Sequence, residues 1–141
     1  MDVSDLSIDP ARVEQGEWVG EKYGTPIPEM GDLCVKVRGV DNGDWRRMQS
    51  KLIGAIPRAK RPGGQIDPDE SDRITSILLR DTALLDWENL KQGEALLAYS
   101  RDLATRFLTE PAYRRFRAAV LWAAQQVGEQ IVKATEELAK N

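Results

Sequence analysis

The stretch from Asp86 to Ala124 constrains the fold of this chain most, because it joins three helical patterns through one aromatic-bearing connection. Gly93 supplies the backbone freedom of a turn, the Ser100 hydroxyl can accept an amide hydrogen bond at a helix start, and Pro111 suits a first helical turn. These signals predict one helix that ends near Trp87, a short helix from about Ser100, and a long helix from about Pro111.

Apolar residues recur at three- and four-residue steps in four segments, as they do on the buried face of a helix. We therefore expect helices over about 42–56, 68–87, 100–108 and 111–138. The second start is marked most clearly, by an N-cap Asp67, a first-turn Pro68 and a Glu70 that resembles a capping box. Asp41 and Asn42 are both N-cap candidates for the first helix.

The last expected helix is longer than a small domain can cover with its other helices. At a rise of 1.5 Å per residue it would reach ~40 Å. The end of its apolar stripe, from Val127 to Leu138, therefore frays, pairs with another copy of the chain, or meets a partner.

Two short runs, 16–20 and 33–38, have the composition of β-strands and flank a loop rich in Gly and Pro. In the second run Leu33, Val35 and Val37 share one face. A two-stranded ribbon is marginal in water, so it must pack on helices. The expected fold is mainly α: about four helices, a small N-terminal two-stranded β-ribbon and a long C-terminal helix. Residues 1–15 are expected to form a flexible arm and 16–141 a single domain.

The composition restricts the classes of function. Hydrophobic residues make up 41% of the 141 residues and charged residues 30%, as in a soluble globular domain. A net charge of −3 argues against nucleic-acid binding by bulk electrostatics, which needs a basic surface. The N-terminus lacks a signal-peptide pattern and no apolar stretch approaches the ~20 residues that span a bilayer. We expect a cytoplasmic protein with neither a membrane nor a nucleic-acid partner.

No constellation for catalysis is visible. Histidine is absent, which excludes His-dependent nucleophiles and His-containing metal sites. Cys34 has no evident activator and is expected to be a structural or exposed thiol. The acidic group 67–72 is expected to favour a helix start rather than to bind a cation, since its spacing is not that of a calcium loop. The basic clusters 58–61 and 114–117 are expected to be solvated, although the second could meet an acidic partner surface. We expect no enzyme, no cofactor and no metal.

The order of several motifs resembles that of the tail assembly chaperones of long-tailed bacteriophages. The order is Asp-Trp-Glu, a Gly-bearing polar turn, Tyr-Ser, an amphipathic helix, and Glu-Pro-x-Tyr-Arg-x-Phe-Arg. The upstream segments 31–38 (GDLCVKVR) and 44–52 (DWRRMQSKL) fit the same pattern, so the resemblance covers about 16–127. The chain departs from the family pattern at Ala98, where a proline often precedes the Tyr-Ser pair.

The resemblance implies a function in tail morphogenesis. Such a chaperone binds the tape measure protein, keeps it soluble, is displaced as tail tube subunits polymerise, and is absent from the mature virion. In the family a frameshifted longer form commonly recruits the tail tube protein, and this chain resembles the short form. The implied location is the host cytoplasm, for a chain encoded by a phage or prophage.

The implied mechanism is association of apolar stripes, with an apolar helix of the client lying in a groove of the chaperone. The main apolar stripe of the last helix includes Val120, Ala123 and Val127. Trp122 lies off this stripe and borders a second apolar face with Ala118, Ala119 and Leu121. The residues expected to contact the client or a second copy of the chain are Tyr99, Leu103, Phe107, Phe116, Trp122, Val127 and Ile131. Two alternatives remain: a structural tail or neck protein, and a helical adaptor on DNA, which requires both basic clusters on one face.

Overall fold

The structure, a computed structural model, describes residues 1–7 and 9–129. Within them the helices are α1 (Pro10–Gln15), α2 (Gly43–Gly54), α3 (Pro68–Leu78), α4 (Arg101–Thr109) and α5 (Arg114–Glu129). The strands are β1 (Glu17–Val19), β2 (Cys34–Val37), β3 (Leu84–Glu88), β4 (Lys91–Gln92) and β5 (Ala95–Leu96). Short 3-10 turns connect several of them, including η1 (Val3–Leu6), η2 (Glu21–Tyr23) and η6 (Pro111–Tyr113).

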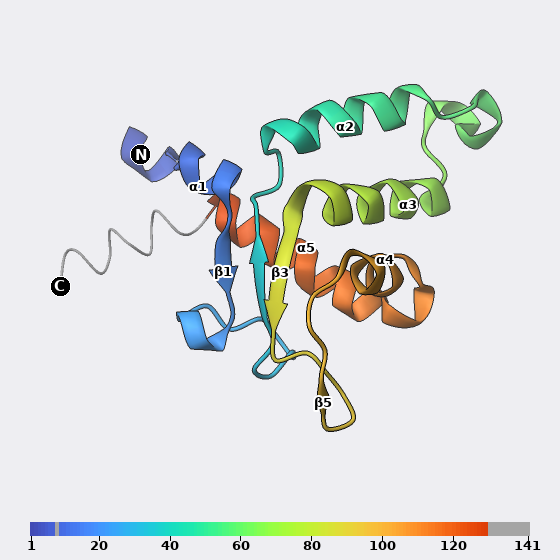
Figure 1. The fold of residues 1–141 in the computed structure, drawn as a ribbon. Helices are drawn as coiled ribbons and strands as arrows, with labels where there is room; N and C mark the ends of the chain where they lie inside the picture. The colour runs from blue at the N-terminus through green and yellow to red at the C-terminus, as the bar shows by residue number, and fades with distance from the viewer. Residues whose placement is uncertain (8, 130–141) are drawn as a thin grey trace.

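The fold is mixed α/β, so the expectation of a mainly α protein with about four helices and a two-stranded ribbon is wrong. The predicted pairing of β1 with β2 is confirmed, but β3 adds a third antiparallel strand on the other side of β2. A second antiparallel pair, β4 and β5, forms a hairpin that projects from the body (Figure 1). Strand β3 therefore pairs with the edge of β2 that the predicted two-stranded ribbon would have left free.

The error lies at the end of the second helix, which was expected to continue to Trp87. Helix α3 ends at Leu78 and passes through a wider π-helical turn, η5 (Leu79–Ala83), into extended backbone at Leu84. Backbone pairing begins at once, because the amide of Arg38 donates to the carbonyl of Ala83 at 2.9 Å. The apolar residues from Leu84 to Trp87 fit a helical stripe as well as a strand, so periodicity alone did not separate the two.

Three predicted helix caps are confirmed. The side-chain oxygens of Asn42, Asp67 and Ser100 accept hydrogen bonds from amides in the first turns of α2, α3 and α4. The capping-box interpretation of Glu70 is wrong, since its carboxylate pairs instead with Lys60 and Arg73, each at 3.0 Å. These hydrogen bonds and ion pairs lower the pKa of Glu70, Arg73 contributing most.

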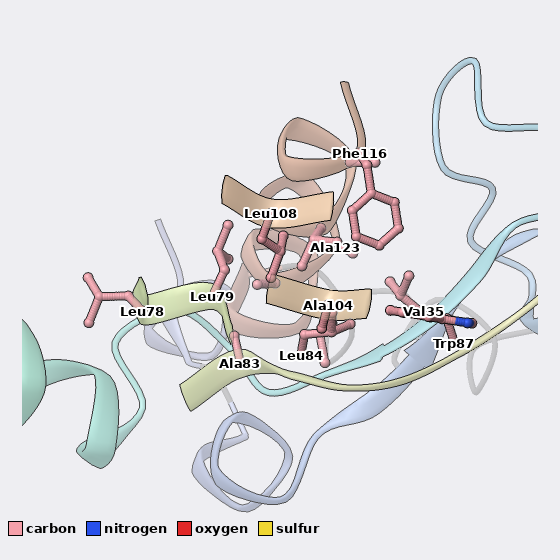
Figure 2. Packing of buried hydrophobic residues seen from close by; sticks show 14 of the residues in the cluster. Val35, Leu78, Leu79, Ala83, Leu84, Trp87, Ala104, Leu108, Phe116 and Ala123 are labelled. Carbon is pink, nitrogen blue, oxygen red and sulfur yellow. The ribbon is translucent and has the colours of Figure 1, made fainter. Parts of the chain in front are cut away.

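The core lies between the three-stranded sheet and the helices α3, α4 and α5, with α5 passing behind the sheet in Figure 1. Val35 and Trp87 are opposite each other in register and point into it, and Figure 2 shows them facing the side chains of α4 and α5. Val120, Ala123 and Ala124 are fully buried on α5. The main stripe predicted for this helix is therefore its core-facing side.

The other face of the sheet is covered in part by η2. The Tyr23 ring stacks on Trp18 with ring centroids 5.5 Å apart, and its hydroxyl donates to Glu88 at 2.8 Å. Cys34 is fully buried beneath this turn, although the alternation of the strand placed it on the outer face. Burial raises the pKa of the Cys34 thiol. Of the two roles expected for this thiol, structural or exposed, its burial fits the structural one.

Replacing Gly20 with alanine is expected to displace the turn that covers Cys34. A Cβ at Gly20 would lie 2.4 Å from Cys34 Sγ and 2.9 Å from its Cα, which is closer than real contacts allow. If local closure weakens by about 1.4 kcal/mol, Cys34 should react with a thiol reagent about tenfold faster in the native protein. Gly54→Ala is the control, since Gly54 lies in α2, its φ is not positive, and a Cβ there meets nothing within 4 Å. Equal labelling rates for both variants would contradict this account of the turn.

Candidate partner-binding surface

An aromatic cluster joins β3 to the helices that follow it. Trp87 is its centre, with ring centroids 5.0 Å from Tyr99, 6.1 Å from Phe107 and 5.9 Å from Phe116. Tyr113 packs edge-on against Phe107 at 4.9 Å. The Trp87 indole N–H also donates to the carbonyl of Leu97 at 2.8 Å, which ties the β4–β5 hairpin to the core. The hairpin is therefore held beside the cluster.

A recess of about 170 Å³ lies between this hairpin and the aromatic cluster. We call it the hairpin recess, and it is lined by Leu90, Lys91, Gln92, Leu97, Arg106, Phe107, Tyr113 and Phe116. Its lining includes two cations and no acid. The guanidinium of Arg106 lies 5.9 Å from the Phe107 ring centroid and 5.6 Å from that of Tyr113. The recess thus offers an apolar floor with a cationic rim.

A second recess, of about 240 Å³, lies where the loop before β2 meets α5. We call it the loop recess, and it is lined by Ile27, Pro28, Glu29, Met30, Arg115, Ala118, Ala119 and Trp122. Ala118 is exposed and Leu121 and Trp122 are half-buried, so these three form an apolar strip along the solvent side of α5. This strip and the loop recess form one continuous apolar surface, because they share Ala118 and Trp122.

The structure brings some of the seven predicted contact residues to these surfaces. Phe107 and Phe116, each 9% exposed, form the inner wall of the hairpin recess, and half-buried Trp122 borders the loop recess. Tyr99 and Leu103 are half-buried and pack on the core. Val127 is 4% exposed and belongs to the core cluster. Ile131 lies outside the described residues.

The loop residues that line both recesses were not predicted from the sequence. The hairpin supplies Leu90 and Leu97, and its turn carried a signal at Gly93, which has a φ of +63°. The loop recess takes Ile27 and Met30 from a connection rich in Gly and Pro, where no periodicity marks the inward side chains. These residues face the helices because of the sheet, which brings distant segments together.

Acidic side chains near the start of α3 form ion pairs with cations of both basic clusters, 58–61 and 114–117. Glu70 pairs with Lys60 at 3.0 Å, and Asp72 lies 3.6 Å from Arg117. These carboxylates stand between cations of the two clusters, which is unlike the single basic face that a DNA adaptor requires. The acids of this segment therefore serve ion pairing as well as the helix start.

A third ion cluster fixes the start of α4. Asp81 accepts two hydrogen bonds from Arg80, at 2.8 and 3.0 Å, and one from Arg101 at 2.8 Å. Its pKa is lowered, chiefly by the hydrogen bonds from Arg80 and also by the charge of Arg101. The end of η5 and the beginning of α4 are thereby held together, which positions α4 beneath the aromatic cluster.

Among the described residues, no cluster of three or more Cys, Asp or Glu side chains has an arrangement that could hold a metal ion. None of the helices in this part of the chain has the length and apolar character needed to cross a membrane.

Comparison with known proteins gives one family. The model of the family described as YdaY prophage protein matches residues 40–141, which is more than half of the chain. No curated protein and no solved structure matches.

Proposed function

We propose that this chain, which belongs to the YdaY prophage protein family, is a tail assembly chaperone that binds the tape measure protein and keeps it soluble. It acts without catalysis or cofactor, in the cytoplasm of the host, and is absent from the mature virion. Recruitment of the tail tube protein through a frameshifted longer form belongs to the same proposal. Prophage origin and the motif order from Asp86 to Phe116 support it.

The observation that carries the proposal is the apolar surface along α5, formed by the strip Ala118, Leu121 and Trp122 together with the loop recess. An amphipathic helix binds such a surface by burying its apolar stripe, and one inserted side chain can occupy a recess. An anchor residue fits the space of about 240 Å³, since Leu and Phe are smaller than that volume. The client helix would then lie along α5.

The charges near this surface favour a client helix that carries acids beside its apolar stripe. Arg114, Arg115 and Arg117 lie at the start of α5, and the loose pairing of Arg115 with Glu29 is 3.8 Å long between two exposed side chains. Such surface pairs contribute little, so Arg115 remains open to a competing carboxylate. The strip supplies the apolar contact and the arginines orient the client.

Replacing Ala118 with arginine is expected to abolish recovery of a soluble complex with the tape measure protein encoded by the same prophage. Ala118 is exposed and lines the loop recess, so a long charged side chain would obstruct the recess and leave the core intact. Loss of one buried anchor costs about 2–4 kcal/mol of binding, or roughly 30- to 900-fold in affinity. The measurement is co-expression followed by size-exclusion chromatography with light scattering.

Ala59→Arg is the control, because Ala59 is exposed in the turn after α2, undergoes the same change as Ala118 and lines neither recess. It should bind the client like the unaltered protein. If both arginine variants keep the client soluble, the strip on α5 is not the client site. Detection of the chain in purified virions would favour the structural tail or neck protein instead.

A further inference from the structure

Charge is separated along this chain far more than its net charge of −3 indicates. Residues 43–64, which span α2 and the loop that follows, contain six basic and one acidic side chain. Residues 1–29 contain seven acidic and two basic side chains. We call these the basic pole and the acidic pole. Figure 1 places the N-terminus and the loop after α2 at opposite ends of the molecule.

Three cations of the basic pole are open to a partner. Arg46, Lys51 and Arg58 are exposed, and no described carboxylate pairs with them. In contrast, Arg47 pairs with Asp44 at 2.7 Å and Lys60 with Glu70 at 3.0 Å. Residues 46 and 50 are four positions apart, as are 47 and 51, so the four lie on one side of α2. The solvent side of this helix is therefore a cationic stripe that continues into the loop.

The first residues of the acidic pole combine charge with exposed apolar side chains. Met1, Val3 and Leu6 are three of the six large hydrophobic side chains that are exposed in the described part of the chain. Asp2 and Asp5 alternate with them in the sequence. Such a segment fits a row of lysine and arginine side chains, whose heads pair with carboxylates while their methylene stems cover apolar groups.

We propose that residues 1–7 of one copy dock on the basic pole of the next copy, so that the protein associates head to tail. Opposite poles of equal excess charge at the two ends of one molecule favour this orientation and oppose contacts between like poles. The contact is heterologous, so it repeats from copy to copy and extends into open rows unless the rotation between copies closes a ring. A row of copies suits the many sites along one extended client. Docking between copies requires no client. The docking can therefore be absent from a protein that binds the tape measure protein, and it can occur in a protein that does not.

The first test is analytical ultracentrifugation of the unaltered full-length protein over a range of concentrations. At ~20 mM salt the weight-average mass is expected to rise with concentration beyond twice the 15.8 kDa of one chain. At ~500 mM salt, where the Debye length falls to a few ångströms, the mass should return to that of one chain. A single chain at low salt and millimolar concentration would overturn the proposal.

Two variants test the polarity of the contact. Lys51→Glu with Arg58→Glu removes the basic pole and keeps residues 1–7, and a chain that lacks residues 1–7 keeps the basic pole. Each alone should remain a single chain, because each has one docking half. Mixed at low salt, they should form a complex of two chains and nothing larger, because neither free end can grow. A mixture that stays as single chains would overturn the proposal.

The matched control is Lys91→Glu with Arg114→Glu, which changes the net charge equally at two exposed cations outside the basic pole. This control should associate like the unaltered protein. Loss of association in the control would show that net charge alone governs it and would contradict the proposed contact. Circular dichroism checks that each variant is folded, which we expect because the altered residues lie outside the core cluster.

Discussion

Replacing Trp87 with alanine is expected to lower the free energy of unfolding by about 4 kcal/mol, since truncating a large buried aromatic side chain costs roughly 3–5 kcal/mol. Trp87 is 4% exposed and touches the rings of Tyr99, Phe107 and Phe116. Its loss also leaves the carbonyl of Leu97 without the indole donor. Urea denaturation followed by far-UV circular dichroism measures the change without relying on tryptophan fluorescence.

Two further variants separate the contributions of Trp87. Trp87→Phe keeps a ring and removes the donor, so it should cost about 1–2 kcal/mol and loosen the hairpin. Trp18→Ala is the comparison outside the core, where a half-buried ring stacks on Tyr23. It should cost about 1–2 kcal/mol, because much of its area is already solvated. If Trp18→Ala and Trp87→Ala lowered the free energy of unfolding equally, Trp87 would not be the residue on which the aromatic cluster depends.

Replacing Asn42 with alanine is expected to cost about 3 kcal/mol, because it removes a helix cap and leaves the buried carbonyl of Thr82 without its donor, while the Gly39 carbonyl keeps the backbone amide of residue 42. Asn42 is completely buried. Its Nδ2 donates to the carbonyls of Gly39 and Thr82, both at 2.9 Å, and its Oδ1 accepts from the amide of Trp45 at 2.9 Å. One side chain thus caps α2 and ties it to the end of η5.

Asn42→Asp separates the two roles of the side chain, which are to accept from the helix amide and to donate to the two carbonyls. Stability is again measured by urea denaturation. Aspartate still accepts at the helix start but directs a carboxylate at two carbonyls, so this variant should be destabilised to a similar extent. Gln49→Ala, at a half-buried position on the same helix, should change stability by less than about 1 kcal/mol. If Asn42→Asp were as stable as the unaltered protein, capping alone would explain the residue.

Local signals predicted the helix starts well. Asn42, Asp67 and Ser100 each cap a helix because the cap interaction involves only residues two or three positions away. The pairing of β1 with β2 also followed from two short runs of β-strand composition, of which the second alternates. The residues that determine these features lie close together along the chain, so a single sequence contains the signal.

Non-local pairing was the limit of the prediction. Leu84 to Glu88 becomes a strand because it finds the free edge of β2, about fifty residues earlier in the chain. Its own residues support a helix equally well. The same limit applies to the recesses, since Ile27 and Trp122 become neighbours only through the sheet and α5. Trp122 was identified as lying off the main stripe, but its partners in the loop before β2 had no signal.

The apolar surface on α5 is the proposed binding site for the tape measure protein. Co-expression of this chain with the tape measure protein of its own prophage tests this binding, with the unaltered protein, Ala118→Arg and Ala59→Arg in parallel. We expect a soluble complex containing many copies of this chain for the unaltered protein and for Ala59→Arg, and an insoluble client for Ala118→Arg. An insoluble client with all three, while this chain elutes alone, would contradict the proposal.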